Sequence, residues 1–243
     1  MNLTTMITVN FIIGLGAGWA LGEAGRWLLA RRGLTPPGAP PAAGEAAAEQ
    51  GATGHALRWP GRLAANSAAA FGTAVLFALM AMRFGFTGAW GIGLLLSALS
   101  VLVTYTDLTA RIIPNGIVLL FGAALLIAAP IISGEPPWVH LLGLACGGVL
   151  LLLLSALTFG RGVGMGDVKL LCILGAVVGF PGVLILLFLA SLLGMSVGLA
   201  QMIRRGRGHR TIAFGPYLAA AALIVHAYGK EIIHWYMTSV VHL

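Results

Sequence analysis

Long apolar segments joined by short polar ones constrain the fold of this chain more than any other feature of its sequence. A transmembrane helix needs roughly 20 mostly apolar residues. Charged residues make up only 9% of the chain, against roughly 25% in a soluble domain, so polar side chains are too few to cover a water-facing surface. We therefore predict an all-α, polytopic membrane protein with about eight transmembrane helices. The apolar segments are 5–29, 64–82, 89–106, 115–132, 138–159, 168–180, 182–203 and 212–228.

The stretch 168–203 is too long for one transmembrane helix. As a single helix of about 36 residues it would measure about 54 Å, whereas the hydrocarbon core of a bilayer is roughly 30 Å thick. Gly179, Pro181 and Gly182 in its middle are strong turn signals. We therefore expect two spans that meet at 179–182.

The basic residues fall mostly on one side when the eight segments alternate across the membrane. Cytoplasmic loops carry an excess of Lys and Arg. With the N-terminus outside, twelve of the 14 Lys and Arg residues lie on the inner side, so we predict this orientation. The inner residues are Arg26, Arg31, Arg32, Arg58, Arg62, Arg111, Arg161, Lys169, Arg204, Arg205, Arg207 and Arg210, and the outer ones are Arg83 and Lys230.

Four parts of the chain follow from this layout. Residues 1–32 are predicted to form an N-terminal transmembrane anchor, and 33–63, rich in Ala, Gly and Pro, a flexible cytoplasmic loop. Residues 64–230 are predicted to form the membrane-embedded core. The apolar tail 231–243 is too short to span the membrane.

Charge and cysteine content narrow the choice of partners. The net charge of +7 is explained by membrane topology, so we expect no nucleic-acid partner and a lipid bilayer as the surroundings. The two cysteines, Cys146 and Cys172, are isolated in apolar segments, and the six histidines are scattered without metal-ligand spacing. We therefore propose no metal and no cofactor.

Two aspartates, the only ones in the chain, are the candidate catalytic residues. Asp107 lies at the inner end of the third segment and Asp167 at the inner start of the sixth. An acid in or beside a transmembrane helix is costly and indicates function by default. Two spans separate the aspartates, so both fall at the same membrane face. Glu23 differs, because Arg26 lies three residues later on the same helix face and an intrahelical ion pair explains it.

Paired carboxylates suit acid–base catalysis, because one can activate water while the other protonates a carbonyl. A helix C-terminus disfavours an anion and an N-terminus favours one. We therefore expect Asp107 to hold the proton more often and Asp167 to act as the base. The spacing leaves open an aspartyl protease, an ion- or proton-coupled transporter that uses the same carboxylates, and a structural role for both acids.

Three motifs occur in order at and after these aspartates. Residues 164–170 (GMGDVKL) resemble the GxGD segment of the bacterial type IV prepilin peptidases, the A24 family of membrane aspartyl proteases. Residues 107–115 (DLTARIIPN) resemble the other aspartate segment of that family, and residues 209–218 (HRTIAFGPYL) are similar to its final-span signature. The resemblance runs from about 64 to 228. It implies that Asp107 and Asp167 are the catalytic dyad.

The resemblance also implies a substrate and a location. Family members cut type IV prepilins or pseudopilins between a short basic leader and an apolar N-terminal helix, at the cytoplasmic face of the bacterial inner membrane. This chain departs from the family in its first inner loop, which lacks the two CxxC pairs that bind zinc in full-length members. Many members also methylate the new N-terminus, an activity associated with the N-terminal region, where this chain matches the family poorly, so this activity is doubtful here. The sequence leaves the oligomeric state open.

Overall fold

The computed structural model describes residues 2–32, 62–159, 164–205 and 213–239, and the regular structure in this part of the chain is helical throughout. Six of its helices are long and apolar enough to cross a membrane. The all-α, polytopic fold is therefore confirmed, while the count of eight spans and the outer N-terminus stay predictions. The loop predicted at 33–63 lies outside the described residues as far as residue 61. The helices are α1 (Leu3–Arg31), α2 (Arg62–Phe84), α3 (Gly88–Ala110), α4 (Asn115–Ser133), α5 (Pro137–Leu157), α6 (Met165–Arg205) and α7 (Gly215–Ser239).

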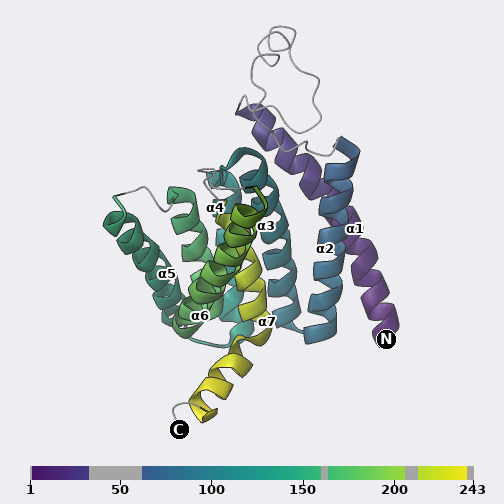
Figure 1. Cartoon of the computed structure of the whole chain (residues 1–243). Helices are drawn as coiled ribbons and strands as arrows, with labels where there is room; N and C mark the ends of the chain where they lie inside the picture. Colours follow the sequence, from purple (N-terminus) through teal and green to yellow (C-terminus); the bar gives the residue numbers. More distant parts are fainter. Residues whose placement is uncertain (1, 33–61, 160–163, 206–212, 240–243) are drawn as a thin grey trace, which may run out of the picture.

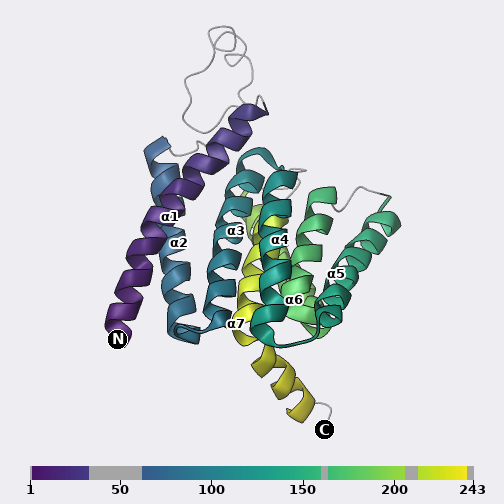
Figure 2. The same cartoon turned by 180° about the vertical axis from the view of Figure 1, so that it is seen from behind.

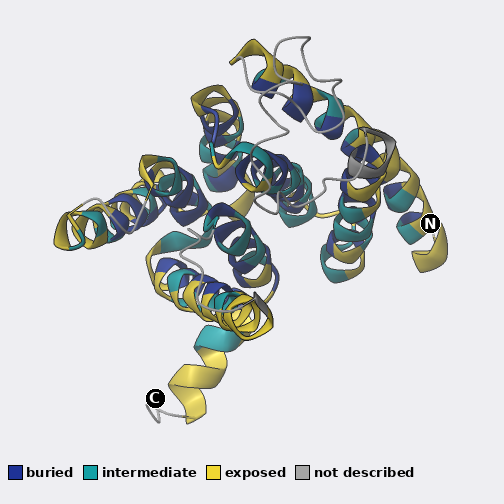
Figure 3. Ribbon diagram, turned by 45° about the horizontal axis from the view of Figure 1, so that its top comes forward, coloured by how far each residue is buried: buried dark blue, intermediate teal, exposed yellow. Residues whose placement is uncertain are grey.

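The helices stand side by side in one bundle, with α1 and α2 at one edge and α5 at the other (Figure 1). Seen from behind, α4 lies beside α3 (Figure 2). The centre is an apolar core to which α3, α6 and α7 contribute Leu96, Leu174 and Leu218, each at most 1% exposed. Buried residues face the middle of the bundle and exposed ones face outward (Figure 3). Large apolar side chains such as Leu119 and Leu157 point outward, which suits contact with lipid.

The break expected at 179–182 is present within α6. Gly179 has φ 72° and ψ 174°, a backbone conformation that glycine adopts without a steric penalty. The chain folds back there, because a Cβ built on Gly175 would lie 3.0 Å from a methyl carbon of Val183. In a straight helix, eight residues would cover about 12 Å. Figure 1 shows both ends of α6 at the upper end of the bundle.

A buried histidine stabilises this break. Ala176 belongs to the last turn before Gly179, where helix carbonyls lack intrahelical donors. His140 on α5 is only 4% exposed, and its Nδ1 lies 2.7 Å from the carbonyl oxygen of Ala176. A carbonyl only accepts, so Nδ1 donates, and Nε2 accepts the hydroxyl proton of Ser133 at 3.1 Å. The sequence alone did not reveal this link between α5 and α6.

The same two helices approach backbone to backbone. A Cβ on Gly143 of α5 would lie only 2.1 Å from the carbonyl oxygen of Gly175 on α6. Small residues permit such close packing of helices in lipid. Glycine at position 143 therefore holds the first half of α6 against α5, and this fixes the position of the helix that begins with the GxGD segment.

Candidate active site

The structure brings the two candidate aspartates to the same end of the bundle. Asp107 lies in the last turn of α3 and Asp167 in the first turn of α6. The end of α3 and the starts of α6 and α7 all lie at the upper end of the bundle in Figure 1. The carboxylates are near enough to repel each other electrostatically, so a shared proton would stabilise the pair.

Asp107 is held by the start of α7. Its side chain is 6% exposed, and its Oδ2 accepts a hydrogen bond of 2.9 Å from the backbone N–H of Gly215. The first N–H groups of a helix have no intrahelical partner and favour an anion. A Cβ on Gly215 would lie 2.7 Å from the same oxygen. Sequence reasoning missed Gly215 as a site residue, although a Gly-Pro pair opening the last apolar segment was a usable signal.

The end of α3 and the start of α4 form the backbone next to Asp107. Arg111 ends α3 in the left-handed conformation with φ 53°, and Pro114 precedes α4 with φ −65°. Proline disfavours helix at the residue before it, and α3 ends at Ala110, a few residues before Pro114. The Arg111 charge acts favourably on Asp107, as expected of a cation near a carboxylate.

Two contacts join the aspartate segments to each other. Lys169 of α6 donates from Nζ to Oδ1 of Asn115 at the start of α4, at 3.1 Å. A Cβ on Gly166 would lie 3.1 Å from the Cβ of Ile113, so the residue before Asp167 packs closely against the segment that follows Asp107. Motifs about 50 residues apart in sequence therefore form one unit.

Glu23 belongs to a separate polar cluster. It forms the predicted ion pair with Arg26, which confirms the structural interpretation. Asn66 of α2 completes the cluster: its Nδ2 donates to Oε1 of Glu23 at 2.9 Å, and its Oδ1 accepts from Nη1 of Arg26 at 2.7 Å. The cluster ties α1 to α2, and sequence reasoning missed its third member.

Within the described residues, no three His, Cys, Asp or Glu side chains lie close enough together to hold a metal ion. Cys146 and Cys172 are partly buried in α5 and α6 as free thiols.

The fold and site define a polytopic helical membrane protein with two aspartates meeting at one end of its bundle. The sequence profile of the Type IV leader peptidase family matches residues 94–199, which contain both aspartates. The chain belongs to this family. No solved structure gives a significant match.

Three relatives show the extent of the similarity, and each bears the name prepilin leader peptidase/N-methyltransferase. The protein from Bacillus subtilis (strain 168) is 35% identical over 167 residues, covering 68% of this chain and 66% of the relative. The protein from Xanthomonas campestris pv. campestris is 34% identical, with 68% and 59% covered. The protein from Neisseria gonorrhoeae is 30% identical, with 68% and 59% covered. The chain thus spans less than two thirds of the length of these relatives.

Proposed function

We propose that the chain is a membrane aspartyl endopeptidase that removes the leader from prepilins or pseudopilins. The observation that carries the proposal is the joining of two aspartate segments, one ending α3 and one opening α6, through the Lys169–Asn115 hydrogen bond and the Gly166–Ile113 contact. The names of the relatives support the substrate class. The proposal leaves out the N-methyltransferase activity in those names, because the family profile matches residues 94–199 and not the N-terminal region.

In the proposed reaction one aspartate acts as the general base and the other as the general acid. One ionised carboxylate takes a proton from water, and the resulting hydroxide attacks the carbonyl carbon of the scissile bond. The other, protonated carboxyl donates to the carbonyl oxygen. When the tetrahedral intermediate collapses, the C–N bond breaks, the leaving amine takes the proton that the base removed from water, and the other carboxyl regains its proton from the new acid group. The Gly215 N–H on Asp107 Oδ2 favours the ionised form of Asp107. We therefore assign Asp107 as the base and Asp167 as the acid, the reverse of the order expected from the sequence.

The reaction is proposed to take place at the cytoplasmic face of the bacterial inner membrane. Basic residues gather at the end of the bundle that holds the aspartates: Arg31 ends α1, Arg111 caps α3 and Arg204 lies at the end of α6. An excess of such residues marks a cytoplasmic side. Because both acids lie at one end of the bundle, the geometry gives the transporter alternative no support.

The test is co-expression with a prepilin in a bacterium that lacks its own prepilin peptidase. Leader removal is scored by the mass of the pilin. We expect wild type and the control Glu135→Gln, an exposed acid between α4 and α5, to process the prepilin fully. Asp107→Ala and Asp167→Ala should reduce processing at least a hundredfold at equal protein level. Full processing by either aspartate variant would refute the dyad.

A further inference from the structure

A groove runs along the bundle between α2 and α7, and α3 forms the floor of its first part. Two adjoining hollows of about 400 and 490 Å³ form it. Leu76 of α2 and Ala220 and Leu223 of α7 line both hollows, so the two are continuous. Since α2 and α7 each pack against α3, the walls of the groove are held in place by helix packing.

The groove starts beside the candidate active site. Leu108 and Pro216 line its first hollow, and they directly follow Asp107 and Gly215, which are joined by a hydrogen bond. Anything seated in the groove therefore reaches the aspartate end of the bundle. The lining is almost wholly apolar, as suits a ligand that enters from lipid.

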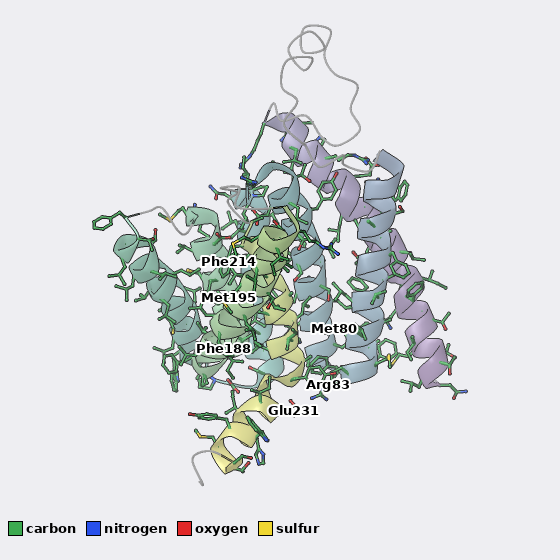
Figure 4. All side chains as sticks on the ribbon, viewed as in Figure 1. Met80, Arg83, Phe188, Met195, Phe214 and Glu231 are labelled. Carbon is green, nitrogen blue, oxygen red and sulfur yellow. The ribbon has the colours of Figure 1, made fainter. Side chains whose placement is uncertain are left out.

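A cation lines the far end of the groove. Arg83 and Tyr228 line the second hollow, and Arg83 is ion-paired with Glu231, as Figure 4 shows at the lower end of the bundle. The stretch 216–228 of α7 between the two ends corresponds to about 18 Å of helix at roughly 1.5 Å per residue. The groove thus has the length of a helical segment of about a dozen residues.

Two hydroxyl groups in the floor have no hydrogen-bond partner among the described residues. They belong to Ser100 and Tyr105, which line the first hollow and are only 5% and 9% exposed. Ser97, one turn earlier on α3, bonds instead to the carbonyl oxygen of Gly93 at 2.7 Å. An unpaired buried hydroxyl costs free energy, so these groups indicate a missing ligand with hydrogen-bonding atoms.

We infer that the groove seats the apolar helix of the peptide substrate, with the N-terminal end of that helix toward Asp107; this inference rests on the peptidase activity proposed above. The first turn of any helix has N–H groups without intrahelical acceptors, and the buried oxygens of Ser100 and Tyr105 can accept from them once these side chains turn toward a seated helix. A lipid acyl chain would fill the apolar lining but offers no donor to these oxygens. A peptide helix satisfies both the shape and the polar groups.

Filling the groove tests this inference. Gly72 of α2 lines the first hollow, and a Cβ there would meet no atom within 4 Å, so Gly72→Leu adds bulk to the groove without a clash. Gly91 of α3 is equally open and lines neither hollow, which makes Gly91→Leu the matched control. Two substrates are compared in detergent: a full prepilin, and a short peptide that carries the cleavage site without the apolar helix.

The expected result is selective. Gly72→Leu should raise KM for the full prepilin at least tenfold and leave cleavage of the short peptide within twofold of wild type, whereas Gly91→Leu changes neither. Unchanged cleavage of the full prepilin would overturn the inference. So would an equal loss on both substrates, because filling the groove should leave the aspartates intact.

A cross-linking measurement tests binding in the groove independently of peptide cleavage. In a background with Cys146 and Cys172 changed to Ala, Ala220→Cys is oxidised together with a prepilin that has one cysteine in its apolar helix. Leu152→Cys, exposed on α5, is the control. We expect a disulfide with position 220 and none with position 152. The same result is expected when Asp107 is replaced by Ala. If cross-linking succeeds but wild type cleaves nothing, the peptidase proposal fails and the groove stands. No cross-link, with phospholipid retained instead, means a lipid site and refutes the inference.

Discussion

Replacing Gly215 by Ala should damage the active site without unfolding the protein. The new Cβ would lie 2.7 Å from Oδ2 and 3.2 Å from Cγ of Asp107, so the carboxylate must move and its bond to the Gly215 N–H must weaken. A hydrogen bond to a charged group contributes about 1.5–3 kcal/mol. With roughly 1.4 kcal/mol per tenfold in rate, losing the bond predicts a fall in kcat/KM of about 10- to 150-fold.

The assay is the initial rate of leader removal by purified protein in detergent, together with a thermal unfolding curve. Gly116→Ala is the matched control, because Gly116 lies in the first turn of α4 at the same end of the bundle and a Cβ there meets no atom within 4 Å. The control should keep wild-type activity. Wild-type kcat/KM in Gly215→Ala would refute the argument that this hydrogen bond supports the reactive state of Asp107.

Three further changes test packing and polar contacts. His140→Ala leaves the carbonyl of Ala176 without its donor, so we expect thermal unfolding in detergent to show a loss of about 1–3 kcal/mol; an unchanged curve would contradict the role of this side chain. Gly143→Leu forces a side chain against the backbone of α6, where a Cβ would already be 2.1 Å from a carbonyl oxygen, and size-exclusion chromatography should show little folded protein. Glu231→Gln removes the partly exposed pair with Arg83 and should change stability by less than about 1 kcal/mol; a larger loss would mean that the pair is effectively buried.

The helices and their break were predictable because both depend on local sequence. Runs of apolar residues mark the spans, and the glycines and proline at 179–182 are strong turn signals, which coincide with the break at Gly179 in α6. The pairing of Glu23 with Arg26 followed from helix periodicity alone. The contribution of Asn66 did not, because it depends on how α2 packs against α1, which no periodicity encodes.

The environment of Asp107 shows why local rules were insufficient at the site. Its place at the end of α3 predicts an unfavourable helix terminus for an anion. The structure supplies a favourable terminus from elsewhere, since Gly215, which lies 108 residues further along the chain, opens α7 and donates to the carboxylate. This contact is the reason that we propose Asp107 as the base, whereas the sequence predicted Asp167. Such a tertiary contact is not encoded in the local sequence around either aspartate.

The groove and the aspartate pair share α7, and this suggests how one peptide bond is selected. Gly215 at the start of α7 holds Asp107, while Pro216, Ala220 and Leu223 of the same helix line the proposed docking groove. A rigid helix fixes the distance between groove and carboxylate. One residue of a docked helix corresponds to roughly 1.5 Å, and a misplacement of about 1 Å can cost on the order of a hundredfold in rate. A substrate helix seated one residue too high or too low would therefore present its cleavage site out of reach, so seating depth can define the cleaved bond without recognition of its side chains.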